Sequence, residues 1–207
     1  MENSLKFKLY YFDTRGRAEP IRLMLHYCRQ EFEDVRFSVS DWDTLKVSMP
    51  QETVPILEVN GKKLPQSRAI MRYLGRLFDL TGRNHLERAV ADSIVDLLAD
   101  FYTQILPWYS IRHLTESDPE NLLKLKNERL IPAVESKVPY FVDYLKEAKS
   151  GYYVKSGITF VDFLCCELFS IVQDFEPEVL LPYPEITDHI KRIYSLPQLK
   201  EYITNRK

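Results

Sequence analysis

The strongest constraint on the fold is a change of pattern about eighty residues into the chain. Before it, short strand-like and helix-like segments alternate, and after it almost every segment has the spacing of a helix. Alternating elements are typical of an α/β domain, and a run of helices is typical of an all-α domain. A polar stretch at residues 79–84, which contains the pair Thr81-Gly82, separates the two patterns. We therefore predict an α/β plus all-α fold, with domains at residues 1–80 and 81–207.

The first part of the chain has the element order βαβαββα. Strands are predicted at residues 7–12, 34–39, 54–59 and 62–64, and helices at residues 17–28, at 42–47 and from Ser67 onward. The pair Asn60-Gly61 is the strongest short hairpin signal and joins the last two strands. Ser67 stands at a helix start, so it is either a simple capping residue or part of a binding site. On pattern alone these two interpretations are about equal.

The second part of the chain begins with a helix over residues 86–101, whose apolar residues recur at spacings of three and four. Asp118-Pro119 then opens a long helix in which Pro132 and Pro139 are expected to cause bends. Thr159 and Asp162 form a predicted capping box. Residues 160–172, which follow them, are apolar on nearly every side. We expect this helix to be the buried centre of the second domain.

The charge balance and the cysteines narrow the class of protein. The chain has 28 Lys and Arg against 30 Asp and Glu, a net charge of −2, which argues against a partner that is nucleic acid or a membrane surface. No apolar run is long enough for a membrane span. Cys28, Cys165 and Cys166 lack zinc-ligand spacing, and the adjacent pair is a poor disulfide geometry. A soluble cytoplasmic protein without a metal site is expected.

Few residues carry a catalytic signal by themselves. The sequence has no phosphate-binding glycine loop and no metalloprotease motif, and its four histidines are scattered. Residues 13–17 join a strand end to a helix start, where main-chain N–H groups favour anions. The alternative interpretation is a polar turn with two solvated arginines. Tyr11 is, by pattern alone, a core tyrosine within a run of three aromatic residues.

Several segments, taken together in order, resemble the cytosolic glutathione S-transferases. In the first part they are residues 8–19, Asp41-Trp42 with Lys46, residues 54–61 and residues 66–70; in the second they are residues 96–101, Pro107-Trp108 and residues 159–163. The most similar branch is the sigma class, which holds the glutathione-dependent prostaglandin D synthases and many nematode and helminth transferases. Each motif is weak alone, but their order and spacing are specific. The resemblance covers essentially the whole chain.

The resemblance implies a thioredoxin-like N-terminal domain that binds glutathione, a helical domain that binds a hydrophobic electrophile, and a homodimer. It implies that Tyr11 is the catalytic hydroxyl and that Arg17 supports it electrostatically. A free thiol, with a pKa of about 8.5, is mostly protonated at neutral pH, and the thiolate is the nucleophile. A phenol that donates a hydrogen bond to the sulfur stabilises that anion.

The same resemblance assigns the binding residues position by position. Those implied to bind glutathione are Tyr11, Trp42, Lys46, Thr53, Val54, a cis Pro55, Gln66, Ser67 and, from the other subunit, Asp100. Those expected to line the hydrophobic substrate site are Tyr102, Trp108 and Tyr202. Packing at a helix junction is an equal alternative for Trp108.

The chain departs from its relatives at two places. Residues 51–53 are Gln-Glu-Thr, where sigma relatives usually carry an aromatic residue, a glycine and Gln or Lys. We therefore expect weaker glutathione binding and a more polar subunit interface. Ala99 replaces an acidic residue that in the prostaglandin synthase branch helps to bind a divalent metal, so metal activation is not expected.

A second hypothesis comes from a different class of function. The chain could be a non-catalytic binding protein for hydrophobic ligands such as haem, or a structural relative like the lens crystallins. The presence of Tyr11, Arg17, Lys46, Gln66 and Ser67 favours the enzyme, because a storage role does not need a complete thiol-activating set.

Overall fold

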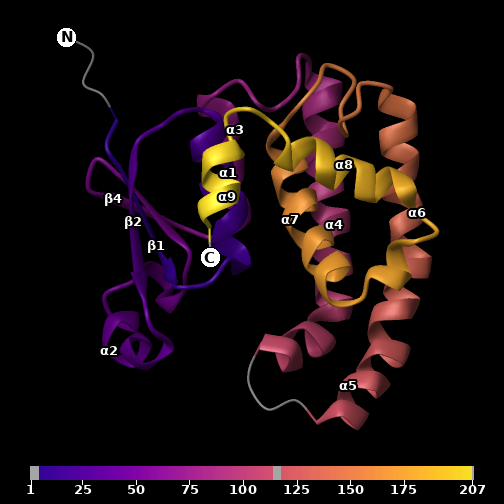
Figure 1. The fold of residues 1–207 in the computed structure, drawn as a ribbon. Helices are drawn as coiled ribbons and strands as arrows, with labels where there is room; N and C mark the ends of the chain where they lie inside the picture. Colours follow the sequence, from indigo (N-terminus) through magenta and orange to yellow (C-terminus); the bar gives the residue numbers. More distant parts are fainter. Residues whose placement is uncertain (1–4, 114–117, 207) are drawn as a thin grey trace. The chain divides into compact units, whose positions relative to one another are not determined.

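A computed structural model describes residues 5–113 and 118–206, which form two compact units (Figure 1). The first unit contains the residues up to Thr81 together with the segment from Tyr194 onward, and the second contains Gly82–Ile193. The segment that begins at Tyr194 thus belongs to the unit built by the N-terminal residues, whereas the sequence pattern grouped it with the helical domain.

A four-stranded mixed sheet forms the centre of the first unit. Its strands are β1 (Phe7–Phe12), β2 (Phe32–Phe37), β3 (Ile56–Val59) and β4 (Lys62–Pro65), in the order β2-β1-β3-β4. β1 runs parallel to β2 and antiparallel to β3, which pairs antiparallel with β4 through the predicted hairpin. Three helices follow the strands in the predicted order: α1 (Glu19–Tyr27), α2 (Trp42–Lys46) and α3 (Ser67–Leu77).

Three short 3-10 turns in the first unit precede α1, α2 and β3. Gly16–Ala18 forms one such turn before α1, so the regular helix begins two residues later than the pattern indicated. The other two turns, Val39–Asp41 and Pro50–Glu52, precede α2 and β3. The second strand also starts two residues earlier than predicted, at Phe32.

The core of the first unit lies where α1 and α3 pack with the central strands. β1 alternates as its pleat requires, with Phe7, Leu9 and Tyr11 buried. The buried helical residues recur at the predicted spacing and are Ile21, Leu23, Met24 and Leu25 in α1 and Ile70, Met71 and Leu74 in α3. Burial of these side chains removes them from water, which is the main favourable term in folding.

The segment from Tyr194 packs beside α1 within the first unit. It includes the short helix α9 (Lys200–Asn205), drawn in yellow next to α1 in Figure 1. The ring of Tyr202 stacks on the ring of His26 in α1, with 4.1 Å between centroids and an angle of 22° between planes. Leu199, at the start of α9, is fully buried. Aromatic and apolar contacts therefore attach this segment to the first unit.

The described residues of the second unit are mostly helical, with a non-helical connection at residues 149–159 that contains a short β-bridge between Val154 and Gly157. Its elements are α4 (His85–His113), α5 (Pro119–Leu125), a π-helical segment (Lys126–Leu130), α6 (Ile131–Ala148), α7 (Phe160–Phe175), a 3-10 turn (Pro177–Leu180) and α8 (Pro184–Tyr194). The expected long helix after Asp118 is interrupted by the π-helical segment just before Pro132, while Pro139 lies inside α6. Among residues 5–113 and 118–206, no helix is long and apolar enough to cross a bilayer.

The buried centre of the second unit is α7, as predicted. Every residue from Phe160 to Val172 is buried. Asp162 accepts hydrogen bonds from the main-chain nitrogen of Thr159 at 2.7 Å and from its hydroxyl at 3.1 Å, which confirms the predicted capping pair. The same carboxylate accepts a bond from the main-chain nitrogen of Tyr153 at 3.0 Å and contacts Nε2 of His189 at 2.9 Å. This cluster joins three segments around one buried charge.

Candidate functional site

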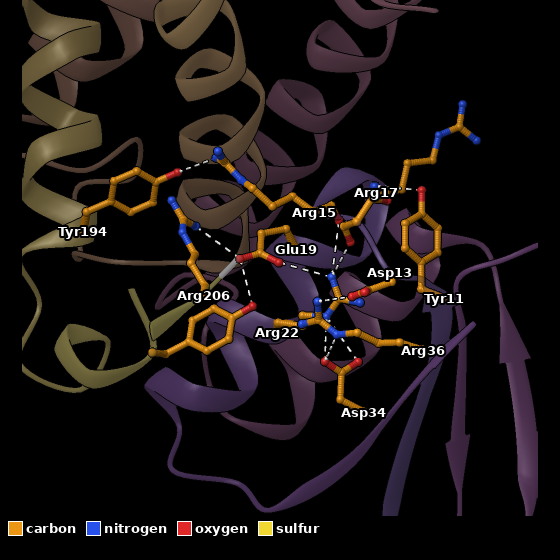
Figure 2. Close-up of polar contacts among 12 residues, drawn as sticks. Tyr11, Asp13, Arg15, Arg17, Glu19, Arg22, Asp34, Arg36, Tyr194 and Arg206 are labelled. Atoms are coloured by element: carbon orange, nitrogen blue, oxygen red, sulfur yellow. Dashed lines mark hydrogen bonds and ion pairs between the residues drawn. The ribbon is translucent and has the colours of Figure 1, made fainter. Parts of the chain in front are cut away.

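Tyr11 lies at the end of β1 and points its hydroxyl at the turn that follows. The side chain is 8% exposed, and the main-chain N–H of Arg17 donates a hydrogen bond to its oxygen at 3.1 Å (Figure 2). Gly16 has a φ of +41°, and a Cβ atom built on it would lie 2.7 Å from that oxygen. Only glycine therefore lets the turn approach the hydroxyl so closely.

This arrangement suits the stabilisation of an anion. A phenolic oxygen that accepts a bond from an N–H group becomes a better donor through its own hydrogen, because polarised hydrogen bonds strengthen one another. A donor held in place before reaction does not have to reorganise when a negative charge develops. For Arg17, the contact with Tyr11 that the structure shows is made by the main chain.

A network of charged side chains, centred on the buried Arg22, packs against this turn on the side of α1. Arg22 in α1 is completely buried, and its Nε contacts both carboxylate oxygens of Asp34, at 3.2 and 3.0 Å. Arg36 binds the same carboxylate at 2.8 Å and also contacts Asp13 at 3.1 Å. Desolvation opposes the charge on Arg36, but its bonds to Asp34 and Asp13 prevail and raise its pKa. Figure 2 shows these side chains converging beneath the turn.

The residues implied to bind the cysteinyl and γ-glutamyl parts of glutathione lie around the start of β3 and of α3. Val54 and Pro55 are buried, and the peptide bond between them is cis, as the resemblance implies. Thr53 precedes them in an extended conformation. Gln66 has a φ of +75° and donates a hydrogen bond from Nε2 to Oε1 of Gln51 at 2.7 Å. Gln51 is thus in contact with a residue of the candidate site.

The expectation that Ser67 caps α3 is wrong. The residue at the N-cap is Gln66, which makes no capping bond with its side chain, and Ser67 is the first helical residue. The positive φ of Gln66 sets the direction in which the chain enters the helix. The binding interpretation of Ser67 stays a prediction.

Trp42 and Lys46 lie on α2. The ring of Trp42 stacks parallel to Phe37, with 6.1 Å between centroids, and meets the ring of Phe12 edge-on at 5.6 Å. The ammonium of Lys46 lies 3.5 Å from the carboxylate of Glu52. Glu52 is one of the residues that depart from the family pattern, so the departure places an anion next to the lysine expected to bind glutathione.

Three other predicted residues lie in the second unit. Asp100 is exposed on α4, and its carboxylate is 3.7 Å from the ammonium of Lys137. The ring of Tyr102 packs edge-on against Tyr109. Trp108 is fully buried. Their roles in binding stay predictions.

Tyr202, the remaining residue predicted to line the substrate site, lies in the first unit. Besides stacking on His26, it donates a hydrogen bond from its hydroxyl to Glu19 at 2.8 Å. Burial, helped by the carboxylate of Glu19, raises the pKa of this hydroxyl. A contribution of Tyr202 to substrate binding remains a prediction.

Sequence reasoning did not assign roles to Gly16, Glu19 and Arg22. Gly16 was visible as a glycine between two arginines at a strand end, which is a signal for a special backbone conformation. Arg22 stands within the apolar run of α1, and a cation at such a position signals a buried partner. The identity of the partners could not be found without the fold.

Two of the cysteines have raised thiol pKa values. Burial raises the pKa of the Cys28 thiol to about 11 and that of Cys165 well above its ordinary value, so both are protonated near neutral pH. Within the part of the chain that the structure describes, no three His, Cys, Asp or Glu side chains are grouped as a metal site would require.

Two family models match the chain, one for each part. Residues 7–76 match the model described as glutathione S-transferase, N-terminal domain, and residues 99–206 match glutathione S-transferase, C-terminal domain. Together these matches confirm the predicted fold class, in which a thioredoxin-like α/β domain precedes an all-helical domain.

Individual relatives agree with the family models. A Caenorhabditis elegans protein described as probable glutathione S-transferase gst-36 is 36% identical over 203 residues, which cover 97% of each chain. A crystal structure described as monomeric Na-GST-3, a glutathione S-transferase from the hookworm Necator americanus, superposes with a TM-score of 0.90 at 39% identity and 98% coverage of both chains. A Nu-class transferase from Haemonchus contortus gives a TM-score of 0.87 at 37% identity and the same coverage. The chain belongs to the glutathione S-transferase family.

Proposed function

We propose that Tyr11 activates the thiol of glutathione for attack on hydrophobic electrophiles. The observation that carries this proposal is the hydroxyl of Tyr11 held at 3.1 Å by the N–H of Arg17, at the end of β1. In the reaction, the thiol loses its proton to solvent and the sulfur forms a bond to an electrophilic carbon. A leaving group such as a halide departs with the electron pair of the bond that breaks. The Tyr11 hydroxyl donates to the thiolate throughout, which lowers the thiol pKa.

The other predicted residues hold glutathione in this proposal. Trp42 and Lys46 bind its glycine end, with the ammonium of Lys46 opposite the terminal carboxylate. The main chain of Val54, before the cis Pro55, pairs with the cysteinyl part, and Thr53 lies beside it. Gln66 and Ser67 bind the γ-glutamyl end. Support comes from their positions in one unit with Tyr11 and from the family resemblance.

The hydrophobic electrophile would contact Tyr102, Trp108 and Tyr202. We further propose a cytoplasmic homodimer of the sigma class that acts in detoxification, in which Asp100 reaches the glutathione amino group bound by the other subunit. The sigma assignment rests on the motifs of residues 8–19, 54–61 and 66–70. One relative is described as Nu-class and another as monomeric. The class and the oligomeric state of this protein should therefore be measured directly.

The non-catalytic alternative is less well supported. A protein that only stores haem or lipids has no need of a donor held against Tyr11 or of a glycine that permits its close approach. The named transferases among the relatives favour the enzyme in the same way.

The test combines retention on immobilised glutathione with a conjugation assay that uses a generic aromatic halide. Retention together with turnover supports the proposed function, whereas retention without turnover on any electrophile supports the binding protein. A panel of aromatic halides, lipid hydroperoxides, unsaturated aldehydes and prostaglandin endoperoxide then identifies the substrate class. Conversion of the endoperoxide would support the sigma-type activity.

A further inference from the structure

Arg22 connects the buried charges to the turn that carries the Tyr11 contact. Its Nη1 donates to the main-chain oxygen of Thr14 at 2.8 Å and to that of Arg15 at 3.4 Å. These carbonyls stand immediately before Gly16, and the N–H of Arg17 then meets the Tyr11 hydroxyl. The guanidinium carbon of Arg22 also lies 6.0 Å from the centre of the Tyr11 ring. Arg22 thus holds the turn from behind and places a positive charge over the ring.

Glu19 connects Arg22 to the C-terminal segment. Its carboxylate is buried, and its Oε2 accepts from Nη1 of Arg22 at 3.2 Å. Its other oxygen, Oε1, accepts from the hydroxyl of Tyr202 at 2.8 Å and from Nη1 of Arg206 at 3.2 Å. The two oxygens of one side chain therefore face different parts of the chain: Oε2 the turn-holding arginine, and Oε1 the segment that begins at Tyr194.

A second connection leads from the same segment to the turn. Nη2 of Arg15 donates to the hydroxyl of Tyr194 at 3.1 Å, and the guanidinium of Arg206 lies 4.5 Å from the centre of the Tyr194 ring. Both connections are visible in Figure 2, where Tyr194 and Arg206 lie on one side of Glu19 and the turn on the other.

We propose that residues 194–206 position the turn of residues 14–17, which carries the contact with Tyr11. In this proposal Tyr202 and Arg206 act on Tyr11 through Glu19 and Arg22. This inference rests on the proposed function. Tyr202 and Arg206 are positioning residues, since each contacts Glu19.

The physical reason is the cost of a buried carboxylate oxygen that loses its donors. Without Tyr202 and Arg206, Oε1 of Glu19 competes with Oε2 for the guanidinium of Arg22. Nη1 of Arg22 then binds the carbonyls of Thr14 and Arg15 less firmly, and the N–H of Arg17 loses its alignment with the Tyr11 hydroxyl. The hydroxyl becomes a poorer donor to the thiolate.

The charges of this network support the same conclusion. Three cations, Arg22, Arg36 and Arg206, are joined by the contacts above to three anions, Asp13, Glu19 and Asp34. The C-terminal segment supplies one of these cations. Its loss leaves an excess negative charge behind a tyrosine whose role is to stabilise another negative charge.

The test uses Tyr202→Phe and Arg206→Gln in the full chain, with Lys200→Gln as the matched control. Tyr202→Phe keeps the ring on His26 and removes only the hydroxyl, while Lys200 is an exposed cation on α9. The first readout is the pH dependence of kcat/KM for the electrophile, measured with saturating glutathione so that it reports on the bound thiol. We expect the apparent pKa of bound thiol to rise by about 0.5 to 1 unit and the rate near neutral pH to fall about threefold to tenfold, as for the loss of one hydrogen bond. The rate should recover at alkaline pH, and KM for glutathione should stay unchanged.

The second readout does not require activity. Exchange of the Arg17 amide hydrogen, measured by NMR, should become about threefold to tenfold faster in both variants and stay unchanged in Lys200→Gln. Arg206→Lys keeps the charge and should restore part of the effect. Arg22→Lys tests the arginine that binds the turn directly. If this variant does not fold, the result with Tyr202→Phe decides the test.

The outcomes distinguish failure of the positioning role from failure of the proposed function. Unchanged thiol pKa and Arg17 exchange in both variants would overturn the positioning role, whatever the wild-type activity. A loss of rate that is equal at every pH and accompanied by a lower Tm would also overturn it, because that pattern indicates stability alone. If wild type does not conjugate glutathione but Arg17 exchange changes as expected, the proposed function fails while the positioning of the turn stands.

Discussion

A Cβ atom on Gly16 would lie 2.7 Å from the hydroxyl oxygen of Tyr11 and 2.9 Å from a carbon of its ring. Real Cβ atoms do not approach so closely, so any side chain at position 16 must displace either the turn or the tyrosine. The same turn supplies the N–H of Arg17 to that hydroxyl. Position 16 therefore controls the geometry of the candidate catalytic group.

We expect Gly16→Ala to lower kcat by about tenfold to a hundredfold, because a displacement of about 1 Å at a reacting group has effects of this size. The matched control is Gly61→Ala. Gly61 also has a positive φ, of +83°, but a Cβ there would meet nothing within 4 Å. Gly61→Ala should lose about 1 kcal/mol of stability through its positive φ alone, and Gly16→Ala should lose more, because its Cβ must also displace the turn or the tyrosine. Steady-state kinetics and thermal unfolding separate the two effects, and equal kcat values for the two variants would contradict the prediction.

Removal of the Tyr11 hydroxyl tests the catalytic group itself. Tyr11→Phe should leave folding and glutathione binding largely intact, raise the pKa of bound thiol and lower turnover by roughly a hundredfold or somewhat less. Thiolate absorbance against pH gives the pKa directly. Tyr10→Phe is the control, since the Tyr10 hydroxyl instead contacts Glu58 at 3.1 Å. A Tyr11→Phe enzyme that conjugates at the wild-type rate would make Tyr11 a core residue only.

Glu52 should weaken glutathione binding by competing for Lys46. Glu52→Gln removes the carboxylate 3.5 Å from the Lys46 ammonium. Because the pair is largely exposed, we expect only about a twofold to fivefold gain in affinity at low salt and less at high salt. Asp43→Asn is the control for net charge, because Asp43 is an exposed acid on α2, the helix that carries Lys46. Calorimetry at two salt concentrations measures both, and identical affinities in the two variants would contradict a specific role for Glu52.

Asp100 and Thr53 test the shared site. If Asp100 binds the glutathione ammonium across a dimer, Asp100→Asn should weaken binding by roughly tenfold or more, as for a charge-assisted hydrogen bond, while the protein stays dimeric. Thr53→Gln should strengthen binding by restoring a longer side chain next to Val54. Calorimetry gives the affinities and sedimentation gives the mass. A wild-type monomer that binds glutathione as tightly as its dimeric relatives would refute the shared site.

Asp162 should be a principal determinant of stability in the second unit. Its two oxygens face the nitrogens of Tyr153, Thr159 and His189 and the hydroxyl of Thr159. In Asp162→Asn the amide must point a donor at donors, which should lower the free energy of unfolding by about 2 to 4 kcal/mol. Asp118→Asn, at the exposed N-cap of α5, should change it by less than about 1 kcal/mol. Urea unfolding distinguishes them, and similar losses in both variants would contradict the prediction.

The local elements could be predicted because each depends on neighbouring residues. The hairpin at Asn60-Gly61 and the capping pair of Thr159 and Asp162 form as the sequence indicates, since a turn or a cap is decided within a few positions. The helix α3 begins at Ser67 as predicted, but the capping role of Ser67 was wrong, because a positive φ at Gln66, which a non-glycine residue seldom adopts, has no signal in a single sequence.

The candidate site could be predicted only in part, for a related reason. The role of Tyr11 followed from family resemblance, whereas periodicity alone indicated a core residue, and the side chain is in fact buried. The contacts of Glu19 with Tyr202 and Arg206 span more than 180 positions, and no local rule relates residues so far apart. The same holds for Arg22 and the carbonyls of the turn, because an arginine in an apolar helix indicates that a partner exists but not which one.

The return of the chain to its first unit has a consequence for biosynthesis. Glu19 and Arg206 are 187 positions apart, and the whole of the second unit is translated between them. The strands and first helices therefore emerge from the ribosome long before Tyr202 and Arg206, the C-terminal partners of Glu19, have been synthesised. The sheet can form early, as N-terminal segments generally do during synthesis, but the carboxylate behind the turn acquires its full set of donors only when translation has passed the second unit. A nascent or truncated chain would thus contain Tyr11 in a folded strand without the complete support behind it.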